Sequence, residues 1–227
     1  MRLLEDIKSL NKFELALLFF SNIVIFGTYF FLPNTNIVST IASMIGVTSL
    51  VFIAKGVILG QILCIIFSIF YGVISLANGY YGEMITYVCM TLPMNIISLI
   101  SWIKHPFKDT NEVEVASLNY KKILIIFILS LIITAIFYFI LKALNTSSLI
   151  ISTISITTSF IAVSLTFFRS PYYALAYATN DIVLIVLWII ATLKNASNFT
   201  MILCFIVFLI NDIYGFINWK KMQNHQK

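Results

Sequence analysis

Long runs of apolar residues follow one another along the whole sequence, and each is about as long as a membrane-spanning helix. About 20 apolar residues cross the hydrocarbon core of a bilayer as an α-helix. Lipid offers the backbone no hydrogen bonds, so such runs are expected to be helical. The pattern predicts eight spans, with no soluble domain between them, at 13–32, 38–55, 57–78, 83–103, 122–141, 149–168, 172–193 and 199–219.

The composition agrees with this pattern. Hydrophobic residues make up 60% of the chain, charged residues make up 10%, and the mean hydropathy is +1.00. These values are typical of an all-α membrane protein. The first run follows Arg2, Lys8 and Lys12, a basic start that signal peptides share. It has full spanning length and no clear small-residue cleavage site, so we interpret it as a retained helix.

The basic residues predict which ends of the spans face the cytoplasm, because short cytoplasmic loops hold an excess of lysine and arginine. With both termini inside, only Lys142 and Lys194 of the 14 basic residues fall in outer segments. The net charge of +5 then reflects topology and contact with anionic lipid headgroups, and no domain is left to bind nucleic acid. The inner segments hold Arg2, Lys8, Lys12, Lys55, Lys104, Lys108, Lys121, Lys122, Arg169, Lys220, Lys221 and Lys227.

Two pairs of segments have the same layout. The stretch STIASMIGVTSLVFIAKG from Ser39 matches STISITTSFIAVSLTFFRSP from Ser152: a Ser-Thr-Ile start, a hydroxyl-rich helix and one basic residue at the inner end. The stretch LPMNIISLISWIK aligns with LINDIYGFINWKK, which places Asn95 over Asp212 and Trp102 over Trp219. Each tryptophan precedes a lysine at an inner helix end, so both are expected to anchor the chain at the membrane interface.

This repetition predicts two three-helix repeats, at 37–104 and 149–227, which follow a first segment at 1–36 and are joined by a cytoplasmic loop and linker helix at 105–148. Because a single helix joins two units of three, the repeats are expected to be parallel. Parallel repeats are typical of transporters that bind substrate between the units near the membrane midplane. A duplicated scaffold without a transport pathway is the alternative.

Four polar residues in the last two spans are the leading candidates for a binding site. Asn180 and Asp181 lie near the middle of the seventh span, and Asn211 and Asp212 lie near the middle of the eighth. A carboxylate at the bilayer centre costs at least about 2.5 kcal/mol, so it is expected to face protein or water. The alternative is that these groups only join one helix to another by hydrogen bonds.

Further candidates share helix faces with these residues or occupy the first repeat. Amides and carboxylates beside aromatic rings suit a flat solute that forms hydrogen bonds. Pro93 is expected to kink the fourth span. The additional substrate-binding candidates are Tyr177 and Trp188 in the seventh span, Tyr214 in the eighth, and Gln61, Tyr87 and Asn95 in the first repeat.

The sequence gives no sign of an enzyme or of a cofactor site. The three cysteines all fall within predicted spans and match no metal or redox spacing. The two histidines have no partners at ligand spacing, and no phosphate loop or nucleophile motif is present. We therefore expect no metal and no cofactor.

The sequence resembles the PnuC family of bacterial vitamin transporters over roughly 38–220. The resemblance rests on YYGEMITYVCMTLPMNIISLISWIKHP, on RSPYYALAYATNDIVLIVLWIIA and on the segment FLINDIYGFINW that ends at Trp219. It implies a full-length relative of the SWEET sugar transporters in the bacterial inner membrane, with 13–32 as an extra N-terminal helix. It also implies facilitated diffusion of nicotinamide riboside without an ion or ATP, and a cytoplasmic kinase that traps the vitamin by phosphorylation.

The sequence departs from the family at one point. Many members carry tryptophans one and two turns ahead of the seventh-span asparagine, where this chain has Tyr173 and Ala176. Tyr177 or Trp188 is then the expected aromatic wall. Thiamine, riboflavin and deoxynucleosides stay open as substrates, and a proton-coupled carrier that uses Asp181 or Asp212 is the alternative mechanism. Both a monomer and a homo-oligomer fit the sequence.

Overall fold

The computed structural model describes residues 3–31, 37–77, 81–146, 148–194 and 199–227, and it is helical apart from connecting segments and two isolated β-bridges. Eight helices or helical runs in these ranges are long and apolar enough to span a membrane, which confirms the predicted spans. A short first helix was not predicted. The elements are α1 (Leu3–Lys8), α2 (Lys12–Phe31), α3 (Ile37–Lys55), α4 (Ile58–Ala77), α5 (Tyr81–Ile85), the π-helix η1 (Thr86–Thr91), α6 (Leu92–Lys104), α7 (Tyr120–Ala143), α8 (Leu149–Phe167), α9 (Tyr173–Lys194) and α10 (Phe199–His225).

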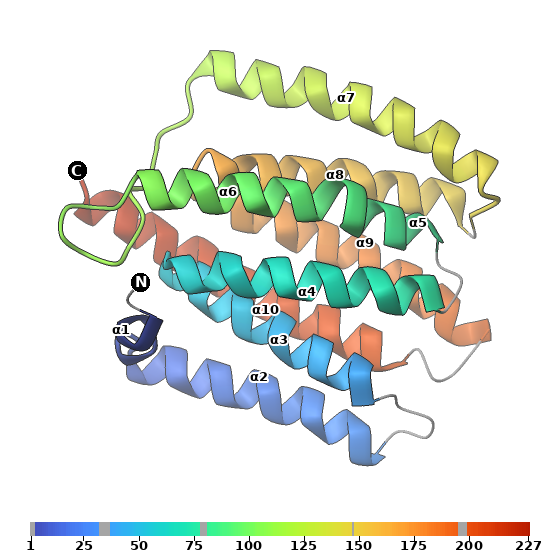
Figure 1. Cartoon of the computed structure of the whole chain (residues 1–227), viewed down its shortest axis with the longest axis horizontal. Helices are drawn as coiled ribbons and strands as arrows, with labels where there is room; N and C mark the ends of the chain where they lie inside the picture. Colours follow the sequence, from blue (N-terminus) through green and yellow to red (C-terminus); the bar gives the residue numbers. More distant parts are fainter. Residues whose placement is uncertain (1–2, 32–36, 78–80, 147, 195–198) are drawn as a thin grey trace.

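Six of the helices pack in a closed ring. In order around the ring, α3 packs against α4, α4 against α6, α6 against α8, α8 against α9, α9 against α10, and α10 against α3. The other two long helices lie outside it: α2 packs on α3 and α10, and α7 packs on α8 (Figure 1). The ring surrounds a common centre to which every member helix presents one face.

Polar contacts hold α2 against the ring. Glu14 caps the start of α2 by accepting the Asn11 N–H at 2.7 Å, while Asn11 Oδ1 accepts the Glu14 N–H at 2.9 Å. The Glu14 carboxylate is fully buried, accepts the Tyr214 hydroxyl at 2.9 Å and pairs with Lys55 at 3.7 Å. One turn before Tyr214, Asn211 donates to the Ser21 hydroxyl at 3.1 Å. Glu14 therefore ties α2 to both α3 and α10.

The fourth span changes its helical geometry just before Pro93. Proline lacks the N–H that a continuous α-helix needs and its ring crowds the preceding turn. The structure accommodates Pro93 with the π-helix η1, which ends two residues earlier at Thr91. Such π segments occur often at functional sites. Here the segment places Tyr87, Thr91 and Asn95 against the centre of the ring.

Helices α3 and α8 end in the same way, at positions that the sequence repeat makes equivalent. The Gly56 N–H donates to the Ile53 carbonyl at 2.9 Å, and the Arg169 N–H donates to the Thr166 carbonyl at 3.0 Å. Gly56 and Arg169 both have positive φ, of 78° and 55°, as expected after a helix C-terminus. This equivalence supports two parallel repeats, which we keep as a proposal.

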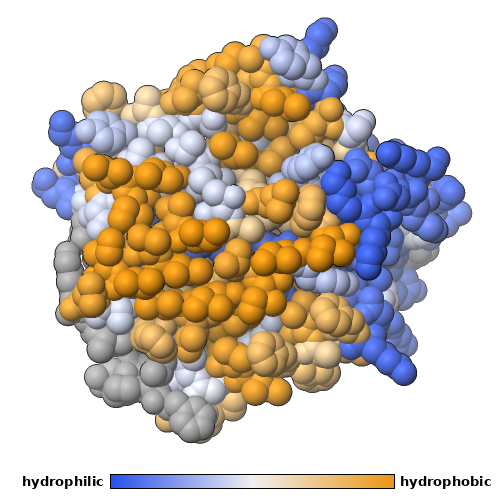
Figure 2. All heavy atoms as spheres, turned by 180° about the vertical axis from the view of Figure 1, so that it is seen from behind, coloured by the Kyte–Doolittle hydropathy of each residue, from blue (hydrophilic) through white to orange (hydrophobic). Residues whose placement is uncertain are grey.

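Both chain termini and the segment between α6 and α7 lie at one end of the molecule (Figure 1). Gln226 accepts the Val115 N–H at 2.7 Å, and Lys55 reaches Glu112 at 3.7 Å. The hydrophilic side chains gather at this end, which is on the right in Figure 2, and the faces along the spans are apolar. This end carries most of the basic residues assigned to the inner side; Arg2 lies outside the described residues. We call it the basic end.

Topology reporters test whether the basic end is cytoplasmic. Reporters fused after Gln226 or inserted after Thr110 should report the cytoplasm, and fusions after Leu144 or Lys194 should report the outside, because the lysine asymmetry orients the chain. The measurement is paired alkaline-phosphatase and fluorescent-protein activity. Two or more fusions on the opposite side would contradict this orientation.

Candidate functional site: an enclosed polar cavity

A cavity with both polar and apolar lining residues lies inside the ring, between one set of three helices, α3, α4 and α6, and a second set, α8, α9 and α10. Its volume is about 50 Å³, and every helix of the ring contributes to its wall. Pockets that bind drug-sized ligands usually measure about 300–1,000 Å³, so the structure shows the cavity in a contracted state. It is lined by Ser49, Leu50, Ile53, Cys64, Phe67, Ser68, Tyr87, Thr91, Asn95, Ser159, Val163, Tyr177, Asn180, Asp181, Phe205, Phe208 and Asp212.

Two carboxyl groups lie next to each other in the wall of this cavity. Asp181 of α9 and Asp212 of α10 are 2% and 3% exposed, and their side chains lie within hydrogen-bonding reach of each other. A hydrogen bond between two carboxyl groups requires a proton on one of them. Within the described residues Asp181 Oδ2 has no hydrogen-bond partner. The cavity therefore presents a buried acceptor oxygen that no protein group uses.

The side chain of Asn180 is held by hydroxyl groups of α8. Its Oδ1 accepts hydrogen bonds from Thr158 at 2.8 Å, Ser159 at 3.0 Å and Ser155 at 3.3 Å. These hydroxyls come from the serine- and threonine-rich pattern of the second repeat. They fix the amide in one orientation at the cavity wall.

The first repeat supplies a less charged wall. Asn95 of α6, the position aligned with Asp212, donates to the Ser68 hydroxyl of α4 at 3.2 Å. Tyr87 of η1 lies over Tyr71 with ring centroids 4.2 Å apart, so its ring closes one end of the cavity. The cavity is consequently acidic on the side of α9 and α10 and neutral on the opposite side.

Six of the ten sequence candidates line this cavity: Asn180, Asp181, Asp212, Tyr177, Asn95 and Tyr87. Four do not. Asn211 and Tyr214 face α2, where they bind Ser21 and Glu14. Trp188 packs in the apolar cluster beyond Tyr87. Gln61 is fully buried one turn from Cys64, towards the basic end of α4, and neither of its amide atoms has a hydrogen-bond partner among the residues that the structure describes.

Sequence reasoning missed the aromatic part of the wall. Phe67, Phe205 and Phe208 line the cavity, but in a sequence they are indistinguishable from lipid-facing residues of a span. Cys64, interpreted as a packing residue, also lines it and lies 3.3 Å from the Ser49 hydroxyl. The usable signal was spacing, because Phe205, Phe208 and Asp212 fall on one helical face.

An aromatic cluster closes the cavity on the side away from the basic end. Phe67 contacts Tyr71, Tyr87 and Phe208 with ring centroids 5.5, 6.1 and 5.6 Å apart. A Cβ atom at Gly46 would come within 2.9 Å of Phe67 and 2.8 Å of Phe208, so α3 presses directly on these rings. Glycine is required there by the close approach.

Two tryptophans close the cavity on the side of the basic end. Trp102 donates its indole N–H to the Thr166 carbonyl at 3.1 Å, and Trp219 donates to the Ile53 carbonyl at 2.8 Å. Their ring centroids are 5.4 Å apart. The third helix of each set thus binds the last turn of the first helix of the other set. We call this arrangement the tryptophan latch.

The latch corrects an expectation from the sequence. Trp102 and Trp219 were expected to anchor the chain at the membrane interface, but they are 1% and 0% exposed and pack between the helices near the basic end. Neighbouring polar groups repeat the pattern, since Ser101 donates to the Phe167 carbonyl at 2.9 Å and Asn218 donates to the Ala54 carbonyl at 2.8 Å. The lysines that follow the tryptophans in sequence therefore do not indicate where the indoles point.

Eight apolar spans, six of which surround a central cavity that is closed separately at each end, define a multi-pass membrane transport protein. The chain belongs to the family described as nicotinamide mononucleotide transporter, which matches residues 36–221.

A relative and a solved structure agree with this assignment. The chain is 25% identical over 189 residues to the nicotinamide riboside transporter PnuC of Neisseria mucosa, a match that covers 81% of this chain and 72% of the relative. It has the fold of the vitamin B3 transporter PnuC seen in a crystal structure, with a TM-score of 0.84, 24% identity and coverage of 96% of this chain and 95% of the other.

Weakening the latch should open the cavity towards the basic end. Trp102→Phe and Trp219→Phe each leave a smaller aromatic ring and remove one hydrogen bond, which typically contributes about 1 kcal/mol, or about a fivefold change in population. With Cys89→Ser and Cys204→Ser as background, Cys64 should be alkylated by a charged thiol reagent about fivefold faster in either variant. Unchanged rates in both variants would show that the latch does not restrict access.

Proposed function

We propose that this transporter carries nicotinamide riboside, or a closely related nucleoside-like vitamin, by facilitated diffusion through the central cavity. The observation that carries the proposal is the charge of the cavity wall. The wall holds the carboxyl groups of Asp181 and Asp212 and, among the described lining residues, no lysine, arginine or histidine. Such a wall favours a neutral or cationic solute.

The charge of the cavity distinguishes between the two substrates named among its relatives. A mononucleotide carries a phosphate, which proteins bind with cationic side chains or backbone N–H groups. A second anion near two carboxyl groups in a low-dielectric site is strongly unfavourable. Nicotinamide riboside carries a positive pyridinium ring and no phosphate, so the cavity fits the riboside.

Each part of the substrate has a matching part of the wall. Tyr177, Phe205 and Phe208 offer ring faces for stacking the flat base, and Tyr177 would take the place of the tryptophans expected from the family resemblance. Asp181 Oδ2 would accept ribose hydroxyls or lie beside the pyridinium ring. Asn180, oriented by α8, would present its amide nitrogen to the substrate.

Transport requires the contracted cavity to widen and to open at one end at a time. The aromatic cluster and the tryptophan latch would release alternately as the two sets of helices rock against each other, as in other carriers built from repeats. Such a carrier only equilibrates its solute, so net uptake depends on a cytoplasmic kinase that converts the arriving vitamin to its phosphate. The acidic cavity would then exclude that phosphate from the return path.

Removal of one charge tests the role of Asp181. Asp181→Asn keeps the size of the side chain and removes the carboxylate. If the carboxylate pairs with the cationic ring, the variant should lose about ten- to a hundredfold in affinity for nicotinamide riboside and thiamine while neutral deoxynucleosides are unaffected. If it accepts ribose hydroxyls, affinity for all nucleosides should fall together. Isothermal titration of purified protein measures both.

Two asparagine variants supply the matched comparison. Asn180→Ala should lower the affinity for every substrate by about tenfold, because the substrate loses a hydrogen-bonding partner in a buried site. Asn211→Ala removes an equally buried amide that faces α2, so it should lower thermal stability and leave affinity unchanged. Equal affinity in the parent, Asn180→Ala and Asp181→Asn would remove the cavity from the transport path.

A proton-coupled carrier is the second candidate, because the paired carboxyl groups of Asp181 and Asp212 offer a place for one proton. Liposomes that contain the purified protein and no kinase separate the two mechanisms. For a uniporter, labelled nicotinamide riboside should reach the same concentration on both sides and go no further when a pH step is imposed. Accumulation above equality would establish coupling and identify the pair as the proton carrier.

A further inference from the structure

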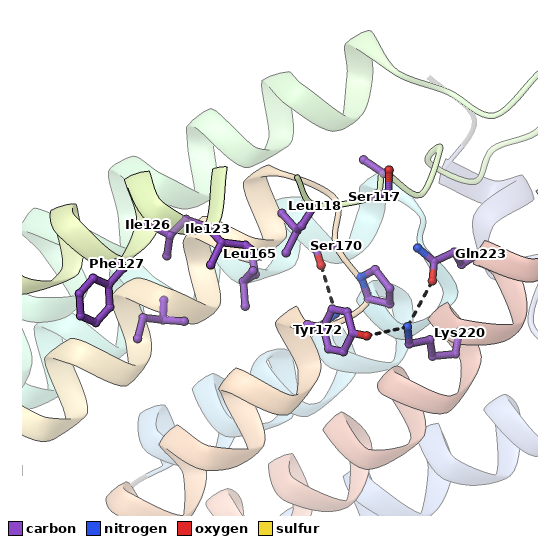
Figure 3. Close-up of a pocket in the computed structure, with 13 residues that line it drawn as sticks. Ser117, Leu118, Ile123, Ile126, Phe127, Leu165, Ser170, Tyr172, Lys220 and Gln223 are labelled. Atoms are coloured by element: carbon purple, nitrogen blue, oxygen red, sulfur yellow. Dashed lines mark hydrogen bonds between the residues drawn. The ribbon is translucent and has the colours of Figure 1, made fainter. Parts of the chain in front are cut away.

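A second pocket lies outside the ring, between α7, α8 and the basic end of α10. Its volume is about 610 Å³, much larger than the central cavity, and none of its lining residues is shared with that cavity. Figure 3 shows it as an elongated space along α7 and α8. Neither the sequence candidates nor the transport path includes it.

The chemistry of the pocket changes along its length. At one end Ile123, Ile126 and Phe127 of α7 face Ile161 and Leu165 of α8 (Figure 3). These residues belong to helices that are long and apolar enough to span a membrane, within two turns of the helix ends at the basic end, so this part of the pocket would lie beside acyl chains. The site is apolar where lipid tails lie.

The opposite end of the pocket is polar and carries a fixed positive charge. Lys220 donates to the Tyr172 hydroxyl at 3.2 Å and to Gln223 Oε1 at 3.3 Å, and its Nζ lies 4.3 Å from the centre of the Tyr172 ring. Within the described ranges no acidic side chain lies at ion-pair distance from Lys220. Ser117 and Ser170 complete this polar end. Neutral partners therefore position the ammonium group without neutralising it.

We propose that this pocket binds one anionic phospholipid of the leaflet at the basic end. The lipid phosphate would lie at Lys220, and one acyl chain would run between α7 and α8. Basic pockets between spans on the cytoplasmic side are a known mode of recognising anionic headgroups. The choice of an anionic lipid follows from the change from an apolar to a basic end along the pocket. A soluble anion would leave the apolar end unfilled, and a neutral lipid would leave Lys220 without a counter-charge.

The bound lipid would fill the space between the linker helix α7 and the second set of helices and stabilise their packing. Helix α7 packs on α8 of the ring, and the pocket occupies the space between these helices near Lys220. A lipid there would replace missing side-chain contacts. It would thus stabilise the position of α8, whose last turn also receives the Trp102 hydrogen bond.

Lipid retention tests the proposal. Native mass spectrometry of the full chain, with phosphatidylglycerol and phosphatidylcholine supplied at equal concentration, should show one retained phosphatidylglycerol and a stability gain with that lipid alone. Lys220→Gln should lower phosphatidylglycerol affinity by about fivefold, the effect of one surface cation on an anionic lipid. Ile161→Trp, which fills the apolar end, should remove the retained lipid while Lys220 stays in place.

The matched control is Lys221→Gln, which removes an exposed lysine next in sequence that does not line the pocket. It should retain the lipid as the parent does. An equal loss of phosphatidylglycerol affinity in Lys220→Gln and Lys221→Gln, or an unchanged lipid preference in Lys220→Gln, would contradict the proposed lipid site. Glycerol 3-phosphate and inorganic phosphate should not stabilise the protein; stabilisation by either through Lys220 would show a phosphate site instead of a lipid site.

Discussion

A polar side chain within the hydrocarbon has no water to bind, and this constraint decides where each polar residue of the spans lies. Residues of α10 illustrate two solutions on adjacent faces of one helix. Asn211 and Tyr214 bind Ser21 and Glu14 of α2, whereas Asp212 faces the enclosed cavity with Asp181. One face holds the protein together and the other is available to a solute.

The same constraint explains the tryptophan latch. The carbonyls of Ile53 and Thr166, in the last turns of α3 and α8, each accept one N–H from the residues that follow the helix, and an indole from the other set supplies a second donor to each. Because the two bonds are equivalent, neither set of helices can tilt away at the basic end without breaking one of them. The aromatic cluster at the opposite end closes the cavity by ring packing, with Phe67 and Tyr87 both stacked on Tyr71.

Hydropathy was sufficient to predict the spans and the fold class, because the bilayer sets both the length and the composition of a spanning helix. The sequence also indicated Asp181 and Asp212 as binding-site candidates, because a carboxyl group within a span needs protein or water around it. Both line the cavity. Hydropathy could not predict that Asp212 lines the cavity while Asn211 faces α2, because Ser21, the partner of Asn211, lies 190 residues away in the sequence. The sequence also could not predict that Phe67 and Phe208 line the cavity, since an aromatic residue in a span has the same sequence pattern whether it faces lipid or solute.

The docking of α2 has a consequence for biosynthesis. Tyr214 and Glu14 are 200 residues apart, so α2 leaves the ribosome long before α10 supplies this partner for the Glu14 carboxyl group. During this interval the Glu14 carboxyl group has Asn11 of its own segment and Lys55 at the end of α3 to bind. Docking of α10 then buries the Glu14 carboxyl group, which binds the Tyr214 hydroxyl and joins α2 to α10. A truncated chain would lack this closure and would expose an acidic helix end, a feature by which quality control can distinguish incomplete copies from finished ones.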